Sequence, residues 1–389
     1  MRASHGIITT LSASFSLTSA ACSKPSFLYV SSYAGGITTY KLGSKGLEQV
    51  GSISQICGTN PSWQTLVGED QYYCINENWD QGNGTFTSAK LNADGTLAFV
   101  GNSSTHGGPV HIALYGENGH GVATANYGSG TVDTLDISNP ALPKVLQTEV
   151  FPVTPDNRTG QEQSRPHQGV LDPTGNFLVF PDLGWDLLRV YQVGSSSLQL
   201  TSKTAHELDR GTGPRHGVFL KTDSKTFFYV ANELANTILG FEITYENDEL
   251  SFSQVFNGTT HGNGEVPPSE TRAGELILSH DNKFLIVSSR LGLTDTFTLS
   301  NGTTIKSDSL ITFSIDQQSG KLAFVQKAPS GGNFPRHFTF NKAGTQVAVV
   351  SGVDQWITIF ERDVATGKIG KSLATATLTS GPNHILWKE

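Results

Sequence analysis

The sequence predicts an all-β fold, a seven-bladed β-propeller closed by strands from both chain ends, and three observations lead to this prediction. One unit recurs seven times: a turn with Pro and often His, a short spacer, and an apolar run that ends near Asn. Successive turns lie 47 to 62 residues apart, which matches one four-stranded blade plus variable loops and exceeds the usual solenoid repeat. The apolar runs are short and rich in Val, Ile, Phe and Tyr, and almost nothing resembles a long amphipathic helix.

The copies of this unit run in order along the chain and are preserved to different degrees. The turn is clearest as Gly-Pro-Val-His at residues 108–111 and as Gly-Pro-Arg-His at residues 213–216. Arg-Ala-Gly-Glu at residues 272–275 is an eroded copy in which Ala replaces the Pro. Each turn is followed by a strand end, at residues 60–63 and 75–76, 108–111 and 122–126, 165–167 and 180–182, 213–216 and 228–232, 272–275 and 287–289, and 334–337 and 349–351.

The remaining copy is divided between the two chain ends. Phe-Leu-Tyr-Val-Ser-Ser at residues 27–32 has the strand without the turn, and Gly-Pro-Asn-His at residues 381–384 has the turn without the strand. A repeat divided in this way implies a closed ring, in which strands from both ends complete one blade. The 42 Gly residues suit tight hairpins, and the single Met suits a core of β-branched and aromatic side chains.

Length and charge limit the domain organisation and the partners. The chain has 389 residues, but no Pro/Ser linker divides it, so residues 23–389 are expected to form a single domain. A net charge of −8 without any Lys/Arg run argues against a nucleic-acid or anionic-membrane partner. No apolar stretch reaches the length that a transmembrane helix needs.

Residues 1–22 differ from the rest of the chain. Arg2 precedes a mildly apolar run without acids that ends in small residues, as a secretory signal does. A secreted or cell-surface location is therefore expected, with a cytoplasmic location as the alternative. Five Asn-x-Ser/Thr sequons are compatible with glycosylation, although a chain this rich in Asn, Ser and Thr contains several by chance. They lie at Asn83, Asn102, Asn157, Asn257 and Asn301.

The three cysteines leave two interpretations open. Cys57 and Cys74 lie close enough in sequence to pair in an oxidising compartment. Alternatively, Cys74 is simply a small apolar strand residue. Cys22 lies at the expected cleavage site of the signal.

Comparison of the copies with one another separates scaffold from chemistry. A His follows two positions after the Pro in four turns, at His111, His216, His337 and His384. Their shared position predicts a shared structural role, in which the imidazole hydrogen-bonds a neighbouring blade or turn. The residue between Pro and His varies instead, and we call the residues at this position the turn ring. Among them, His167, Arg215 and Arg336 stand out. The turn ring consists of Ser62, Val110, His167, Arg215, Gly274, Arg336 and Asn383.

A second variable ring, the strand-end ring, directly follows the strand ends. It consists of Tyr33, Glu77, Tyr127, Leu183, Glu233, Arg290 and Gly352. Equivalent positions in a propeller form a circle around its axis, so both rings are expected at one end of the channel. Polar side chains from separate blades would converge there, as a substrate pocket requires. Alternatively, Glu77, Glu233 and Arg290 form a belt of ion pairs that closes the channel, and His167 is an ordinary loop histidine.

Six segments resemble the seven-bladed propeller lactonase family, which includes bacterial 6-phosphogluconolactonases and fungal 3-carboxy-cis,cis-muconate lactonizing enzymes. The resemblance extends over residues 27–389 and implies the propeller fold. The segments are Asn-Pro-Ser-Trp at 60–63, Ala-Asn-Tyr-Gly-Ser-Gly at 125–130, Pro-His-Gln-Gly-Val-Leu-Asp-Pro-Thr-Gly at 166–175, Gly-Pro-Arg-His at 213–216, Val-Ala-Asn-Glu at 230–233 and Gly-Asn-Phe-Pro-Arg-His at 332–337.

The resemblance also implies catalytic residues. In the fungal cyclase-like members these are a His of the Pro-His segment, an Arg of the Gly-Pro-Arg-His turn, a Glu that ends the Val-Ala-Asn-Glu strand and a later strand-end Arg. Here they fall on His167, Arg215, Glu233 and Arg290. From the same two rings, Glu77, Tyr127 and Arg336 are the predicted substrate-binding residues.

Such a set suits the opening or the closing of a lactone ring. Opening needs a base to activate water and a cation beside the oxyanion, whereas closing onto a diene needs anion-binding arginines and a general acid. Arg215 and Arg290 can bind carboxylates. His167 is the expected proton-transfer group, with Glu233 as its partner or as the alternative acid or base. Neither route needs a metal or an organic cofactor, and the histidines lack the spacing of a zinc site.

Two function hypotheses follow. The first is a lactone-processing enzyme that acts on a small carboxylate-bearing substrate, either by hydrolysis or by carboxymuconate-type lactonizing cycloisomerisation. No Gly-rich phosphate loop or paired Lys cluster signals recognition of a phosphate. The second is a non-catalytic secreted or cell-surface glycoprotein that uses the propeller faces for binding.

Overall fold

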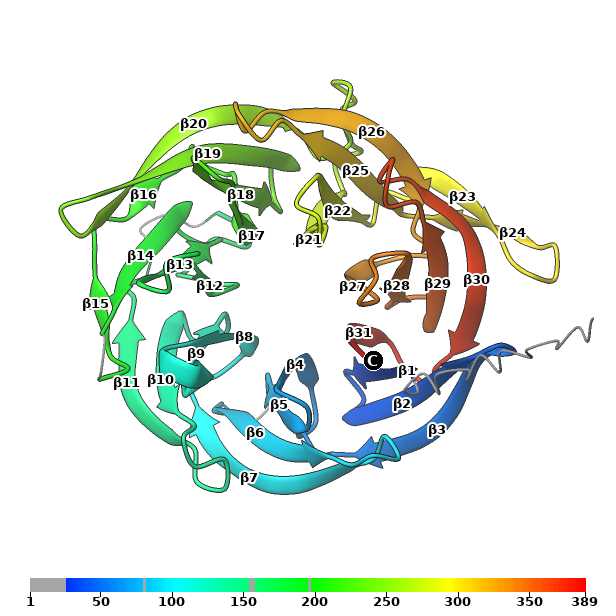
Figure 1. Cartoon of the computed structure of the whole chain (residues 1–389), viewed down its shortest axis with the longest axis horizontal. Coiled ribbons are helices and arrows are strands. Elements are labelled where there is room, and N and C mark those ends of the chain that lie inside the picture. Colours follow the sequence, from blue (N-terminus) through cyan, green and yellow to red (C-terminus); the bar gives the residue numbers. More distant parts are fainter. Residues whose placement is uncertain (1–25, 80–81, 154–157, 195–196) are drawn as a thin grey trace, which may run out of the picture.

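The computed structural model describes residues 26–79, 82–153, 158–194 and 197–389, which form a ring of β-sheets (Figure 1). These residues make seven blade sheets, all antiparallel, and one added two-stranded hairpin. The predicted all-β class and the number of blades are therefore confirmed. Within the described ranges the one helix is the 3₁₀ turn η1 (Glu117–Gly119). A search of the same ranges finds no helix that could span a membrane.

The blades follow one another around the ring, each with its inner strand beside the channel. Blade 1 has, from inside to outside, β31 (Pro382–Lys388), β1 (Ser26–Ser32), β2 (Gly36–Gly43) and β3 (Gly46–Ser54). Blade 2 has β4 (Pro61–Val67), β5 (Gln71–Asn76), β6 (Gly84–Leu91) and β7 (Leu97–Thr105). Blade 3 has β8 (Pro109–Tyr115), β9 (Gly121–Asn126), β10 (Thr131–Asp136) and β11 (Lys144–Val150).

The remaining four blades continue in chain order. Blade 4 has β12 (Val170–Leu171), β13 (Phe177–Asp182), β14 (Leu187–Val193), β15 (Leu200–Ser202) and the short β16 (His206–Glu207). Blade 5 has β17 (Pro214–Lys221), β18 (Thr226–Asn232), β19 (Thr237–Glu246) and β20 (Glu249–Thr259). Blade 6 has β21 (Arg272–Leu278), β22 (Phe284–Arg290), β25 (Ser309–Ile315) and β26 (Leu322–Pro329), with the hairpin β23 (Asp295–Thr298) and β24 (Thr304–Ser307). Blade 7 has β27 (Pro335–Phe340), β28 (Gln346–Ser351), β29 (Trp356–Arg362) and β30 (Ile369–Thr377).

Blade 1 closes the ring as the divided repeat predicts. Its strands β1 and β31 come from opposite ends of the described chain and lie side by side in Figure 1. They pair antiparallel, from Phe27 opposite Lys388 to Ser31 opposite His384. This pairing confirms the predicted closure by strands from both termini.

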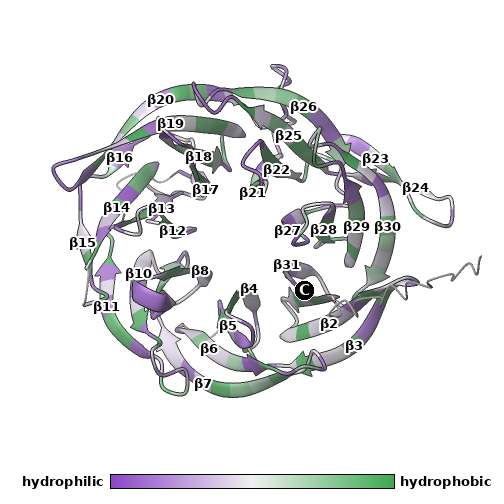
Figure 2. Cartoon of the chain, viewed as in Figure 1, coloured by the Kyte–Doolittle hydropathy of each residue, from purple (hydrophilic) through white to green (hydrophobic). Residues whose placement is uncertain are grey.

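The hydrophobic core is divided into clusters between neighbouring blades, because alternate side chains of a strand point to opposite faces of its sheet. In β18, Phe228 and Val230 pack toward blade 4 with Phe177, whereas Phe227 and Tyr229 pack toward blade 6. Both faces are buried, so the inner strands are apolar at successive positions rather than at every second one. Figure 2 shows hydrophobic residues in the strands all round the ring.

A β-bulge in the inner strands produces the turn ring. In blade 2, Pro61 pairs with Asn76 and Trp63 pairs with Ile75, which leaves Ser62 as the extra residue. The same shift in register follows the turn proline of β8, β17 and β27. A bulge re-aims the side chain of its extra residue, so the variable residue of each copy is set apart from the regular alternation of its strand.

The structure also locates the residues linked to secretion. Cys57 and Cys74 form a disulfide with their Cα atoms 5.8 Å apart, which decides between the two interpretations of these cysteines. The sequon residues Asn83, Asn102, Asn257 and Asn301 are all exposed. Asn157, Cys22 and the expected signal at residues 1–22 lie outside the described residues.

Candidate functional site

A third ring fills the centre of the channel, from the residues two positions after each turn Pro. This central ring consists of Trp63, His111, Gln168, His216, Glu275, His337 and His384. The indole of Trp63 lies at its middle, with ring centroids 4.1 Å from His111 and 4.4 Å from His384. As predicted, imidazoles of this ring hydrogen-bond the next blade: His111 Nδ1 accepts from Gly169 N, and His337 Nδ1 accepts from Ile385 N, both at 3.4 Å.

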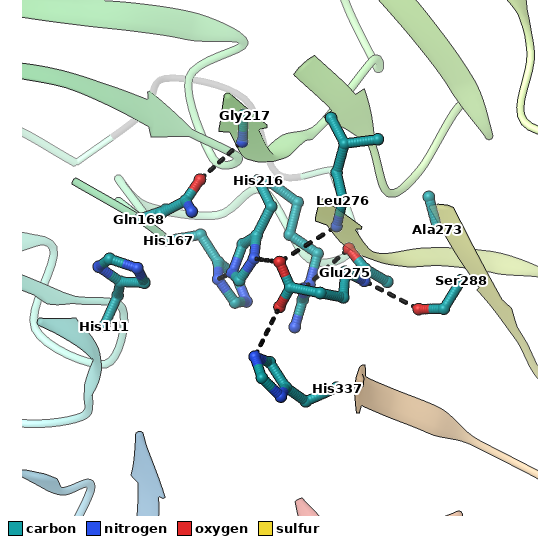
Figure 3. Close-up of polar contacts among 12 residues, drawn as sticks. His111, His167, Gln168, His216, Gly217, Ala273, Glu275, Leu276, Ser288 and His337 are labelled. Carbon is teal, nitrogen blue, oxygen red and sulfur yellow. Dashed lines mark hydrogen bonds and ion pairs between the residues drawn. The ribbon is translucent and has the colours of Figure 1, made fainter. Parts of the chain in front are cut away.

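His216 contacts both neighbouring blades. Its Nδ1 lies 2.9 Å from Glu275 Oε1, and its Nε2 lies 3.1 Å from Nδ1 of His167 (Figure 3). All three side chains are buried, with at most 5% of each residue exposed. The predicted contact with a neighbouring blade is therefore present, and the two ring nitrogens of His216 also connect a buried carboxylate to a predicted site residue.

The four predicted catalytic residues come together from blades 4, 5 and 6. Glu233 Oε2 lies 2.9 Å from Arg215 Nε and 2.9 Å from Arg290 Nη2, so one carboxylate oxygen bridges two guanidinium groups. Each of these arginines also donates a hydrogen bond to a backbone carbonyl, Arg215 to Gly274 O at 2.9 Å and Arg290 to Ala273 O at 2.6 Å. Arg215 also lines the same small cavity as His167.

The predicted substrate-binding residues surround this cluster. Arg336 Nη2 lies 3.4 Å from Glu77 Oε1, which also accepts a hydrogen bond from the Tyr33 hydroxyl at 3.3 Å. The Trp79 indole donates to the other oxygen of Glu77. Since Glu77 is only 1% exposed and its oxygens are occupied, it orients Arg336. Tyr127 packs against His167 with ring centroids 5.5 Å apart.

The expected alternative, a belt of ion pairs, is therefore part of the same arrangement. Both Glu77 and Glu233 form ion pairs with arginines of these rings. These ion pairs are still reached by solvent, because 20% of the Glu233 side chain and 15% of the Arg336 side chain remain exposed.

Burial and charge set the protonation of the site. Burial, and then the guanidinium of Arg215, lower the pKa of His167 well below its ordinary value, so the imidazole is neutral at pH 7. Burial raises the pKa of the Glu233 carboxyl, but Arg290 and Arg215 more than offset this and hold it below the ordinary range. Burial, and then Arg290, lower the pKa of Arg215 to about 9. Glu233 is thus an anion and a poor proton donor, whereas His167 is neutral and can accept a proton.

Two cavities adjoin these residues. A small one of about 10 Å³ lies between the turn ring and the central ring and has room for roughly one water molecule. A wider pocket of about 270 Å³ is lined by Arg336 and Asn383 together with Tyr33, Leu291, Phe334, Gly352, Val353, Gly381 and Pro382. Two larger cavities, of about 490 and 520 Å³, are lined by other residues of blades 1 and 2 and by none of the predicted site residues. In the described ranges no group of three or more His, Cys, Asp or Glu side chains is placed to hold a metal ion.

Glu275 is a buried residue beside the predicted site that the sequence patterns did not single out. It sits in the eroded copy, where neither the Pro nor the His of the repeat is present. Comparison of the copies with one another nevertheless distinguishes Glu275. At the third turn position, six copies have an aromatic, imidazole or amide side chain, and Glu275 is the one acid.

Comparison with known proteins identifies the family. Residues 27–387 match the model of the family described as Lactonase, 7-bladed beta-propeller. The chain belongs to this family. Membership confirms the resemblance inferred from the six segments, and it supports the prediction of a lactone-processing enzyme.

Individual relatives of this lactonase-family protein are distant but nearly full in length. A probable 6-phosphogluconolactonase of Arthroderma benhamiae is 27% identical over 92% of this chain and 88% of its own. The 6-phosphogluconolactonase of Bacillus subtilis is 25% identical over 87% of this chain and 93% of its own. Among solved structures, the periplasmic gluconolactonase of Pseudomonas aeruginosa superimposes with a TM-score of 0.79 at 24% identity, covering 93% of this chain and 99% of that protein, which shows a shared fold.

Proposed function

We propose that this protein hydrolyses a lactone with His167 as the general base. The observation that carries the proposal is a buried, neutral imidazole placed among Arg215, Arg290 and Arg336. A neutral imidazole accepts the proton of a water molecule, and guanidinium groups stabilise the negative charge that develops on the carbonyl oxygen. The names of the two 6-phosphogluconolactonase relatives support lactone hydrolysis over ring closure.

The chemical steps follow from these positions. His167 takes a proton from water as the water oxygen attacks the lactone carbonyl carbon, and the carbonyl oxygen becomes an oxyanion beside an arginine. The ring C–O bond then breaks, and the leaving alkoxide takes the proton back from the imidazolium. The product is one open chain with a hydroxyl and a carboxylic acid, which then loses its proton to the solvent and becomes a carboxylate. Glu233 keeps Arg215 and Arg290 in place throughout, through its two 2.9 Å contacts.

The wider pocket supports a substrate that carries an anionic group on a compact body. Arg336 supplies a cation at its wall, and Tyr33, Leu291, Phe334, Val353 and Pro382 supply most of the remaining contact surface. Its volume of about 270 Å³ suits a small ring rather than an extended molecule. We therefore propose a carboxylate-bearing lactone with few hydroxyl groups as the preferred substrate, ahead of a phosphorylated sugar lactone.

A substrate panel tests these proposals. Purified protein is mixed with a carboxylate-bearing aromatic or unsaturated lactone, an uncharged sugar lactone, 6-phosphogluconolactone and 3-carboxymuconate, and acid release or ring closure is followed against the uncatalysed rate. The expected result is the highest kcat/KM for the carboxylate-bearing lactone. Turnover of 3-carboxymuconate alone would replace hydrolysis with cycloisomerisation, and no turnover of any compound would overturn the proposal of an enzyme.

We also propose that the protein is secreted and glycosylated. The Cys57–Cys74 disulfide and the four exposed sequon asparagines support an oxidising compartment with access to the glycosylation machinery. Mass analysis of protein recovered from its native host tests this. Loss of the segment before about residue 22 and glycan at the sequons are expected, whereas an unglycosylated chain that begins at Met1 would place the protein inside the cell.

A further inference from the structure

The central ring contains one carboxylate, Glu275 on β21, which the hydrolysis steps above do not use. Figure 3 shows it in contact with two imidazoles, His216 on one oxygen and His337 on the other. The His216 contact is a hydrogen bond of 2.9 Å, whereas the His337 nitrogen lies 3.7 Å from the other oxygen, beyond hydrogen-bond distance. Glu275 and His216 are buried, with side chains 3% and 2% exposed.

Glu275 is held in a single orientation by its own strand. The backbone N–H of Leu276 donates to Glu275 Oε1 at 3.1 Å, the oxygen that also faces His216. The backbone N–H of Glu275 donates to Ser288 Oγ at 2.9 Å, which ties the bulge of β21 to β22. A fixed, buried carboxylate oxygen can only accept hydrogen bonds. The nitrogen of His216 that faces it must therefore carry a proton.

The direction of the next hydrogen bond follows from this one. Burial, and then Arg215, lower the pKa of both His216 and His167, so each ring is neutral and carries one N–H. With its proton on Nδ1, His216 presents a lone pair on Nε2 toward His167. The contact of 3.1 Å between His216 Nε2 and His167 Nδ1 then requires the proton of His167 to be on Nδ1. The Nε2 atom of His167 is left with a free lone pair.

We propose that Glu275 and His216 are positioning residues that fix the tautomer of His167 so that its Nε2 atom is the base. This inference rests on the proposed hydrolysis for its catalytic meaning, but the tautomer itself is a property of the free protein. Neither Glu275 nor His216 needs to contact the substrate, because they act through the Nδ1 side of His167.

The same chain of contacts eases protonation of the base. When His167 gains a proton at Nε2, it becomes a cation beside Arg215, Arg290 and Arg336, which repel it. Transfer of the Nδ1 proton to His216 Nε2 moves that charge to His216, where the carboxylate of Glu275 faces it at 2.9 Å. One proton moves, within the hydrogen bond between the two imidazoles, and no electrons are exchanged. The arginines act on both rings, but only His216 contacts the carboxylate of Glu275, so the positive charge comes to lie beside an anion.

The experiment uses protein labelled with ¹⁵N-histidine and Glu275→Gln, a variant of nearly equal shape. Long-range ¹H–¹⁵N spectra of the wild type should show His167 and His216 with the proton on Nδ1. In Glu275→Gln the amide can donate to His216, so His167 should shift toward the Nε2–H form. With a lactone that the wild type hydrolyses, kcat should fall about 100-fold with little change in KM, since a wrong base tautomer lowers kcat even more in a Ser-His-Asp triad.

Two further variants separate positioning from general damage. Glu275→Asp keeps the carboxylate and should restore part of the kcat and the wild-type tautomer. His111→Gln changes the same repeat position in blade 3, where the imidazole contacts Gly169 N, and should leave the tautomer of His167 unchanged. A wild-type spectrum with His167 in the Nε2–H form, or an unchanged tautomer in Glu275→Gln, would overturn the proposal. A wild type without any lactonase activity would instead overturn the proposed function, and the spectrum would still decide the tautomer.

Discussion

Blades 4 to 7 and blades 1 to 3 share one backbone design around the channel but direct different side chains into it. Blades 4 to 7, the charged side, carry His167, Arg215, Gly274 and Arg336 in the turn ring and Gln168, His216, Glu275 and His337 in the central ring. Blades 1 to 3, the neutral side, carry Asn383, Ser62 and Val110 in the turn ring and His384, Trp63 and His111 in the central ring. The bulge that sets the variable residue apart from the strand alternation occurs on both sides, in β4 as in β17.

The difference shows which blades supply most of the charged groups in the channel and which supply mainly packing. A buried charge is tolerated only when a partner compensates for it, so each of the three arginines in the two rings has a carboxylate. Glu233 serves Arg215 and Arg290, and Glu77, from the neutral side, serves Arg336. On the neutral side, Trp63 packs among imidazoles and fills the channel.

Removal of the proposed base should give the largest difference in activity between a variant on the charged side and one on the neutral side. His167→Ala should lower kcat/KM about 1000-fold, or about 4 kcal/mol in the barrier, since general base catalysis contributes that order of rate. Ser62→Ala changes the equivalent bulge residue of blade 2 and should stay within about twofold of the wild type. Initial rates with the best lactone of the panel measure both. Equal losses in the two variants would mean that the sides do not differ in function.

Removal of the carboxylate that two arginines share should have the next largest effect. Glu233→Gln leaves Arg215 and Arg290 without their shared anion and should lower the free energy of unfolding by about 3 kcal/mol. Glu361→Gln is the matched control, because Glu361 pairs with Lys371 at 3.3 Å on the exposed surface and should change stability by about 0.5 kcal/mol or less. Urea unfolding of the two variants gives the comparison. Similar shifts would show that the charged side is not held together by its ion pairs.

The sequence predicts the fold more completely than it predicts the contacts on the charged side. The blade number followed from the period of the turns, because six of the blades are each built from one stretch of the chain, and the closure followed from the copy divided between the two chain ends. The members of both rings followed as well, since equivalent positions form a circle in a propeller. The period of the turns does not show which ring members are in contact, because Glu233 lies 18 residues from Arg215 in sequence and 57 from Arg290. Glu275 was missed for a related reason: its turn has lost the Pro and His by which the other copies were found.

The disulfide tests whether the neutral side acts mainly as scaffold. Cys57 and Cys74 are 17 residues apart and join the turn before β4 to β5. Replacing both with Ala should lower the free energy of unfolding by about 2 to 3 kcal/mol, because the unfolded chain gains freedom when such a loop is opened. Turnover at 25 °C should remain that of the wild type. A large fall in kcat with an intact fold would assign the neutral side a part in catalysis.

The smallest effect concerns the protonation of His167. Burial, and then the guanidinium of Arg215, lower the pKa of this imidazole well below its ordinary value, and a protonated imidazole accepts no proton from water. We therefore expect kcat/KM to be constant near neutral pH and to fall only well below the ordinary pKa of histidine. Initial rates measured across acidic pH give this profile, and circular dichroism checks the fold at each pH. In Arg215→Gln the acid limb of the residual turnover should lie at a higher pH, because one of the cations that lower the pKa of His167 has been removed. A limb at the same pH in both proteins would assign this ionisation to another group.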